Sequence, residues 1–200
     1  MKESVLITGA SGFIGFHLIE AALNRGLTVY AAVRTGSDVR HLKGYDIKFC
    51  ELNYNNVELL AKQLEEIGCQ YIIHAAGTTR TGSQEAYNAI NADYTFNLAS
   101  AAIQGLGSKL LKFILISSLA ALGPLNNMEM TITEEVVPAP VTAYGRSKLL
   151  AEHRLQELGL LPLLCCDQLL FMVRASGIFL SYCVPSVGVW RRISERSISN

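Results

Sequence analysis

Short apolar runs, rich in β-branched residues, alternate with longer amphipathic segments up to about residue 160. The short runs predict strands at 4–8, 28–33, 47–51, 71–75 and 113–117. The longer segments predict helices at about 12–24, 57–67, 84–102 and 143–158, the first two followed by Gly26 and Gly68 as stop signals. Such alternation is typical of βαβ units, so the pattern predicts an α/β fold built on a parallel sheet.

The composition is that of a globular chain with one main core. Its 200 residues are 50% hydrophobic and 17% charged, which suffices to bury a substantial core. The 17 basic residues balance the 17 acidic ones, so no net field favours nucleic acid, and small molecules are the expected partners. The five cysteines lack C-x-x-C spacing or a nearby histidine cluster, which indicates no metal site and fits a reducing cytoplasm.

Neither a leader peptide nor a membrane anchor is predicted. The first apolar run is short and is followed by glycines, unlike a signal peptide. The most apolar stretch, residues 161–180, is interrupted by Asp167 and Arg174, and a spanning helix needs about 20 uncharged residues. We therefore expect a cytoplasmic protein that does not insert into a membrane.

Three glycines follow the first predicted strand in the sequence VLITGASGFIG, residues 5–15. Gly9, Gly12 and Gly15 stand where the strand turns into a helix, and their missing side chains let the backbone approach a pyrophosphate. The free N–H groups and positive end of the helix would hold the phosphates. The alternative is a tight turn packed for its own sake, but its place at the start of a βαβ unit favours binding.

The second predicted strand ends at Arg34, where an acidic side chain would bind the ribose hydroxyls of NAD. A guanidinium pairs instead with the 2′-phosphate of NADP. The sequence therefore favours NADP over NAD, with Ser37 as a second donor. The alternative is that Arg34 is a solvated loop residue.

Tyr144 and Lys148 lie four residues apart in a predicted helix and so share one of its faces. A neighbouring ammonium stabilises a phenolate, which would lower the pKa of the tyrosine from about 10 and allow acid/base catalysis. Ser117 and Ser118 follow the fifth predicted strand, at the carboxyl edge where open α/β sheets bind ligands. We expect a serine hydroxyl to meet the phenol there.

The spacing T-G-x-x-G-x-x-G, the G-F-I-G at residues 12–15 and the Y-G-R-S-K at residues 144–148 together resemble the extended short-chain dehydrogenase/reductases. This is the NAD-dependent epimerase/dehydratase family, which includes UDP-glucose 4-epimerase and dihydroflavonol reductase. The resemblance covers residues 3 to about 160. It implies a Rossmann-like, doubly wound parallel sheet with three α/β/α layers.

The resemblance also implies a catalytic site made of Ser118, Tyr144 and Lys148. Tyr144 would be the acid/base, Lys148 would in addition hold the nicotinamide ribose, and Ser118 would position the substrate oxygen, with Ser117 as the alternative serine.

A cofactor site for NAD or NADP is implied by the same resemblance. H-A-A-G at 74–77 matches the family's loop over the cofactor, and Asn91 with Asn97 resembles the helix that follows. The expected cofactor-binding residues are Gly9, Ser11, Gly12, Phe13, Ile14, Gly15, Arg34, Glu51, Leu52, His74, Ala75, Ala76, Gly77, Asn91, Tyr144 and Lys148. Alternatively, His74 caps a strand and Asn91 is an ordinary polar helix residue.

Two positions depart from the family pattern. Cys50-Glu51-Leu52 stands where the family usually has Gly-Asp-Leu, so Glu51 is expected to replace the aspartate near the adenine amino group. Tyr94 stands where the family commonly has glycine in Asn-x-x-Gly-Thr, which is expected to alter packing beside the cofactor. Neither departure removes a catalytic group.

The pattern changes after about residue 160. The resemblance implies a sixth strand that carries Arg-Pro and then Tyr-Gly-Pro, but the chain continues L-L-C-C-D-Q-L-L-F and has no lysine after Lys148. One permitted set of codons for residues 166–181, read from the third base, encodes R-P-T-A-V-Y-G-P-R-E-R-D-I-F-I, which restores that motif. We therefore expect an NAD(P)-binding Rossmann domain at 1–160 and an aberrant tail at 161–200.

We interpret the tail as a frameshift product, the alternative being a genuinely divergent tail. A sixth strand formed by it would be accidental, because its apolar residues were not patterned for this sheet. Family members continue into a C-terminal substrate-binding region, most of which is expected to be missing here.

The function implied by the resemblance is that of an NAD(P)-dependent oxidoreductase or epimerase. A nucleotide sugar is the leading substrate class, followed by another carbonyl or hydroxyl compound. The alternative is a cofactor-binding module without turnover, either redox-sensing or a truncated inactive product. A homodimer through the helices that contain Gln84 and Tyr144 is a further family expectation.

Overall fold

The computed structural model describes residues 2–124 and 136–159, together with the backbone of a strand at 163–166. The strands are β1 (Ser4–Thr8), β2 (Thr28–Ala32), β3 (Ile47–Cys50), β4 (Tyr71–His74), β5 (Lys112–Ile116) and β6 (Leu163–Cys166). The α-helices are α1 (Phe13–Asn24), α2 (Val57–Ile67), α3 (Gln84–Asn88), α4 (Tyr94–Leu106), α5 (Leu119–Leu122) and α6 (Ala143–Glu157). The proposed second reading of residues 167–181 lies outside the described residues.

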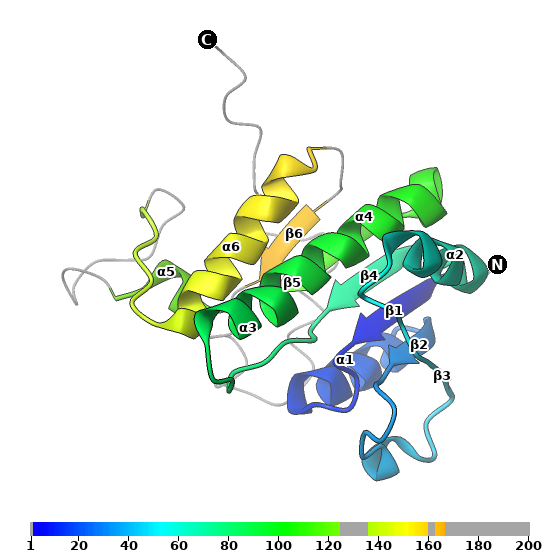
Figure 1. Cartoon of the computed structure of the whole chain (residues 1–200). Coiled ribbons are helices and arrows are strands. Elements are labelled where there is room, and N and C mark those ends of the chain that lie inside the picture. Colours follow the sequence, from blue (N-terminus) through cyan, green and yellow to red (C-terminus); the bar gives the residue numbers. More distant parts are fainter. Residues whose placement is uncertain (1, 125–135, 160–162, 167–200) are drawn as a thin grey trace.

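All six strands are parallel and follow the order β3-β2-β1-β4-β5-β6 (Figure 1). The chain leaves β1 toward β2 and β3 on one side and returns to β4 and β5 on the other. In the register, Thr8 lies beside both Ala32 and His74, so these strands end at one edge. This arrangement confirms the predicted doubly wound sheet, and its switch point lies between β1 and β4, where open α/β sheets bind ligands.

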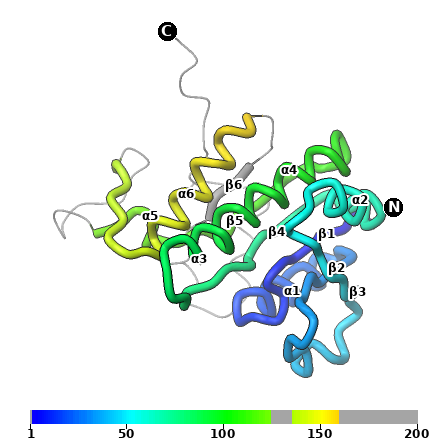
Figure 2. Tube along the Cα trace, viewed as in Figure 1, coloured from blue at the N-terminus to red at the C-terminus, as the bar shows by residue number. Residues whose placement is uncertain are grey.

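Helices cover both faces of the sheet because the strands are apolar on both sides. Val5 and Ile7 pack toward α1, whereas Leu6, between them, packs toward α2 and α4. Figure 1 shows α4 and α6 in front of the strands, and the trace in Figure 2 follows the crossovers that place them there. The chain therefore has the predicted three layers, helix, sheet and helix.

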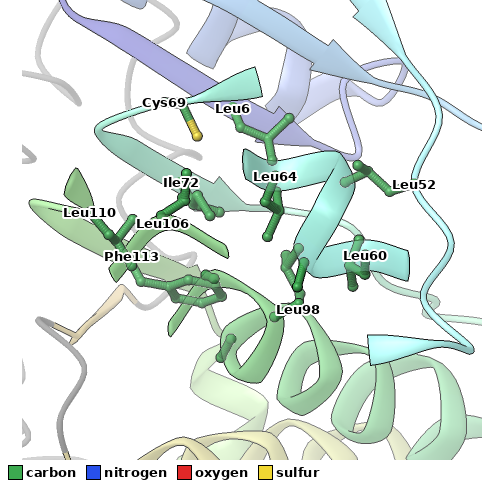
Figure 3. Packing of buried hydrophobic residues seen from close by; sticks show 14 of the residues in the cluster. Leu6, Leu52, Leu60, Leu64, Cys69, Ile72, Leu98, Leu106, Leu110 and Phe113 are labelled. Atoms are coloured by element: carbon green, nitrogen blue, oxygen red, sulfur yellow. The ribbon is translucent and has the colours of Figure 1, made fainter. Parts of the chain in front are cut away.

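The larger core lies between the sheet and the helices α2, α4 and α6. Figure 3 shows Leu64 of α2 and Leu98 of α4 near Ile72 and Phe113 of the sheet, and Leu60 of α2 belongs to the same cluster. All five side chains are fully buried. Burial of a large apolar side chain contributes about 1.5–3 kcal/mol, so this core fixes the strand ends on which the candidate site stands.

Helix α2 matches its predicted bounds because its sequence supplies both end signals. The Asn56 side chain accepts a hydrogen bond from the Leu59 N–H at 2.8 Å, which satisfies a free donor of the first turn. Gly68 ends the helix in the left-handed conformation, at φ +61°, where glycine carries no steric penalty.

The helix predicted at 84–102 differs from the structure. It is divided into α3 and α4 by a π-helical turn at Ala89–Asp93, and α4 continues to Leu106. A single π-turn is easily missed in a sequence, because it shifts the apolar spacing at one point only and leaves a regular helical pattern on both sides.

The sixth strand is present despite the change of sequence pattern. The backbone of β6 pairs with β5 in the register Phe113↔Leu163 to Ile116↔Cys166. Strand pairing requires only backbone groups and an extended apolar segment, which residues 163–166 provide without the family's motif.

Candidate active site

The turn between β1 and α1 is built by glycines that approach other backbone atoms closely. Gly9 has φ +66°, and a Cβ placed on it would lie 2.6 Å from the Ala75 carbonyl oxygen. A Cβ on Gly15 would lie 2.2 Å from the Gly9 carbonyl oxygen. Larger residues therefore do not fit, and the backbone itself forms the surface at the end of β1.

The first turn of α1 offers backbone N–H groups at this surface. No side chain within the described residues caps the helix at Gly12, which is itself exposed. Phe13 has 68% of its surface exposed, and Ser11 and Ile14 are partly exposed. An uncapped, accessible N-terminus on a helix of this length fits a phosphate group.

The segment that follows β2 holds the carboxylate of Glu51. Arg34 is exposed, and the next residue, Thr35, donates through its N–H and its hydroxyl to Glu51 Oε1, at 3.0 and 2.6 Å. These bonds lower the pKa of Glu51, so its carboxylate is charged at neutral pH. Leu52 is buried in the core, and only its backbone can face a ligand.

His74 lies at the end of β4 in a buried chain of hydrogen bonds. Its Nδ1 lies 2.7 Å from Thr8 Oγ1, and its Nε2 lies 3.0 Å from Thr95 Oγ1. The Thr95 hydroxyl donates to the Asn91 carbonyl, so it accepts from Nε2–H, and Nδ1 is left to accept from Thr8.

This arrangement requires a neutral imidazole. Burial, and secondarily the positive charge of Lys148, lower the pKa of His74 to about 3. Thr8 in turn accepts from the N–H of Ala76 at 3.1 Å, so His74 fixes the loop Ala75–Gly77 over the end of β1.

Asn91 lies in the π-turn and is only 1% exposed. Its carboxamide accepts from the Thr78 N–H and donates to the Thr78 carbonyl and to Ser147 Oγ, at 2.8, 3.0 and 3.0 Å. Both amide hydrogens are thus used within the protein. The side chain joins the loop after β4 to α6.

Ser118 and Tyr144 meet at the end of β5, on the edge where the sequence places them. Their hydroxyls form a hydrogen bond that lowers the pKa of Tyr144, but burial has the larger effect, so that this pKa is raised overall. This direction is opposite to the one expected from the Tyr-Lys spacing. Of the two candidate serines, Ser118 is the one in contact with the phenol.

Lys148 lies one turn after Tyr144 and is 4% exposed. Its Nζ donates to the carbonyl oxygen of Ile116, the last residue of β5, at 2.8 Å. This contact anchors the ammonium at the carboxyl edge of the sheet.

Three contacts near this edge were missed by sequence reasoning. The ring of Tyr94 stacks on that of Tyr54, with centroids 5.5 Å apart, and Asn97 donates to the Tyr54 carbonyl at 2.8 Å. Tyr94, which stands where the family commonly has glycine, is thus packed against Tyr54, a residue that the sequence analysis did not consider. Ser117 donates to the carboxylate of Glu152, a buried acidic residue of α6. The spacing of Glu152 from Tyr144, eight residues along the same helix, could have placed it on the same face.

Among the described residues, no cluster of three or more His, Cys, Asp or Glu side chains could hold a metal ion. The same residues include no helix whose length and apolar character would let it span a bilayer.

The glycine turn, the loop after β4 and the Ser118–Tyr144 pair thus lie at the carboxyl ends of neighbouring parallel strands. Residues 5–160 match the model of the NAD dependent epimerase/dehydratase family. The chain belongs to this family.

The chain is also similar to individual curated proteins. The chain is 34% identical over 165 residues to the uncharacterized protein y4nL of Sinorhizobium fredii, covering 76% of this chain and 45% of that protein. It is 26% identical over 174 residues to a UDP-glucose 4-epimerase of Caenorhabditis elegans, covering 78% and 49%. The chain spans about half the length of these relatives.

A solved structure shares the fold. The Bordetella bronchiseptica enzyme WbmG, crystallised with NAD and UDP, superposes with a TM-score of 0.67 at 20% sequence identity. The alignment covers 82% of this chain and 52% of WbmG.

Proposed function

We propose that this chain provides the nicotinamide-dinucleotide-binding part of an oxidoreductase or epimerase that acts on a nucleotide sugar or a related carbonyl or hydroxyl compound. The observation that carries the proposal is the meeting of Ser118 with Tyr144 at the same sheet edge as the uncapped glycine turn. The UDP-glucose 4-epimerase relative, and WbmG with its NAD and UDP, support this substrate class.

The proposed chemistry is a proton transfer beside a hydride transfer. The first turn of α1 would hold the pyrophosphate, and Lys148, after leaving the Ile116 carbonyl, would bind the nicotinamide ribose. Ser118 would align a substrate oxygen, and Tyr144 would donate a proton to it or accept one. A bound nicotinamide supplies the site that gives or takes hydride.

The choice between NAD and NADP depends on two neighbouring side chains. Arg34 favours the 2′-phosphate of NADP, as proposed from the sequence, whereas the Glu51 carboxylate held by Thr35 would repel it. NAD in the WbmG structure supports the unphosphorylated cofactor for that protein. Titration with NADH and NADPH, followed by nicotinamide fluorescence, tests both.

The test of the enzyme proposal compares wild type with Tyr144→Phe. Loss of the phenolic proton donor should reduce turnover of UDP-glucose with NAD by about 10²–10⁴-fold, while the NADH affinity stays within about twofold. Equal turnover in the two proteins would exclude Tyr144 as the acid/base. Absence of NADH and NADPH binding by folded wild type would reject the proposal as a whole.

A second candidate function is a cofactor-binding module without turnover. It is favoured by the change of sequence pattern after about residue 160, where the family match ends. NADH binding without turnover of UDP-glucose, in wild type and Tyr144→Phe alike, would support it.

We also propose the division into a Rossmann domain at 1–160 and an aberrant tail at 161–200. The family match that ends at residue 160 supports this boundary. The DNA across residues 155–185 tests the frameshift: codons that exclude R-P-T-A-V-Y-G-P in the second frame would reject it.

A further inference from the structure

Three consecutive residues at the end of β5 each contact a different residue of α6. The Ile116 carbonyl accepts from Lys148, and Ser118 bonds with Tyr144. Between them, Ser117 donates to the carboxylate of Glu152. The three partners on α6 are spaced four residues apart, at 144, 148 and 152, so they lie in one row along a single face of the helix.

The Ser117–Glu152 contact is the more deeply placed of the two serine contacts. Ser117 is 1% exposed, and Glu152 is 4% exposed. A buried carboxylate loses its hydration and needs hydrogen bonds in return. Well-packed apolar residues often serve stability as well as buried ionic groups do, so stability alone does not explain a glutamate at this position.

Because Glu152 lies in the same row as Tyr144 and Lys148, its contact with Ser117 affects how α6 is oriented at the candidate site. Apolar contacts between a helix and a sheet contribute through buried area and are not directional. The hydrogen bond from Ser117 has a preferred length and angle. It therefore restricts both the rotation of α6 and its position along β5, one turn away from Lys148 and two turns from Tyr144.

We propose that Glu152 is a positioning residue which, through Ser117, seats α6 on β5 so that Tyr144 meets Ser118 and Lys148 meets the Ile116 carbonyl. Its effect on catalysis rests on the proposed function, whereas the seating itself can be measured without a cofactor or a substrate.

The experiment compares Glu152→Ala with Glu152→Gln by titrating Tyr144. The two variants remove the same charge, but the carboxamide oxygen introduced by Glu152→Gln still accepts a hydrogen bond from Ser117. The absorbance of tyrosinate, taken as the difference from the corresponding Tyr144→Phe protein, reports Tyr144 alone. The exposed Glu157 of α6 supplies a control variant, Glu157→Ala.

We expect the pKa of Tyr144 to be higher in Glu152→Ala than in Glu152→Gln by about one unit, because the tyrosine loses the Ser118 hydrogen bond that lowers it. Ser117→Ala, which alters the other side of the contact, should show the same rise. Glu157→Ala should titrate like wild type. The Ser117→Ala result keeps the test valid if Glu152→Ala does not fold, as judged by circular dichroism.

Cofactor affinity gives the second readout. Glu152→Ala and Ser117→Ala should weaken NADH binding by about tenfold, and their combination should weaken it no further, since both remove one contact. If wild type binds no nicotinamide, the proposed function fails while the tyrosine titration still decides the seating. Equal Tyr144 titrations in Glu152→Ala and Glu152→Gln, with only the unfolding midpoint changed, would overturn the proposal in favour of a purely structural role.

Discussion

The glycine turn after β1 and the row along α6 serve the same edge of the sheet by different means. The turn is made of backbone: a Cβ on Gly15 would lie 2.2 Å from the Gly9 carbonyl oxygen. The row is made of side chains that reach from α6 to the end of β5, such as Lys148 to Ile116 at 2.8 Å. The turn depends on glycines that lack side chains. The row depends on hydrogen bonds between residues that are distant in sequence.

This difference determines how each region tolerates change. An added side chain in the turn meets backbone atoms, which cannot move aside by changing rotamer. A single substitution there should therefore cause a large loss of stability and of cofactor affinity. A side-chain row can lose one member while its neighbours retain their contacts, so the α6 row should lose function in steps. His74 lies between the two regions and, through Thr8 and Thr95, contacts the strand before the turn and the helix beyond it.

The largest effect should follow from Gly15→Ala. The added methyl group cannot coexist with the Gly9 carbonyl, so the turn must move, at a cost of roughly 3 kcal/mol in the free energy of unfolding. NADH affinity should fall at least tenfold, since the backbone no longer matches the pyrophosphate. Urea unfolding and fluorescence titration measure the two effects.

Gly12→Ala is the matched control within the same turn. A Cβ at this position lies 3.3 Å from the Gly9 carbonyl oxygen, and φ is −86°, so a small shift accommodates it. If Gly12→Ala and Gly15→Ala lost equal amounts of stability and NADH affinity, the close approach of Gly15 to the Gly9 carbonyl would not explain the sensitivity of the turn. The proposed contrast with the α6 row would then fail.

An intermediate effect should come from protonation of His74. Its pKa is lowered to about 3 in the folded protein, whereas an unfolded histidine titrates near about 6.5. The unfolded state therefore binds one more proton between these values, and stability falls with decreasing pH by about 1.4 kcal/mol per unit below about 6.5. Unfolding free energies from pH 7 to 5 measure this slope.

His74→Gln should flatten that slope, even if it lowers stability at pH 7. The exposed His153 of α6 provides the control, because His153→Gln leaves the buried imidazole in place and should retain the slope. A slope unchanged by His74→Gln would assign the acid sensitivity to other groups.

The smallest effect concerns the selectivity between cofactors. Glu51→Gln removes the negative charge of the carboxylate held by Thr35, while the amide oxygen can still accept from Thr35. The ratio of NADPH to NADH affinity should rise by about threefold, because exposed charges interact weakly in water. Arg34→Ala should lower the ratio, and parallel fluorescence titrations decide. A ratio that Glu51→Gln leaves unchanged would place the adenosine ribose away from this carboxylate.

Much of the fold was predictable because its signals are local. The bounds of β1 and α2 match those predicted, since apolar runs, the Asn56 cap and Gly68 each act over a few residues. The meeting of Ser118 and Tyr144 was also predictable, because parallel strands bring their carboxyl ends to one edge.

The remaining features depend on contacts that no local pattern carries. The rise in the pKa of Tyr144 comes from burial, which requires the tertiary structure. The pairing of Ser117 with Glu152 spans the chain between β5 and α6, and a glutamate in a helix is normally expected to face solvent. The stacking of Tyr54 on Tyr94 likewise joins the loop after β3 to the start of α4, which only the fold brings together.

The π-turn at Ala89–Asp93 determines how this helix would respond to the loss of a residue. One additional residue in an otherwise regular helix turns everything beyond it by about 100°, so Asn91 faces Thr78 and Ser147 while Leu98 of α4 still faces the core. Removal of a single amino acid from that turn would restore a regular α-helix. Asn91 and Leu98 could then no longer both face their present partners. The π-turn thus lets Asn91 and Leu98 keep their separate partners, and a deletion within it should be harder to tolerate than most substitutions.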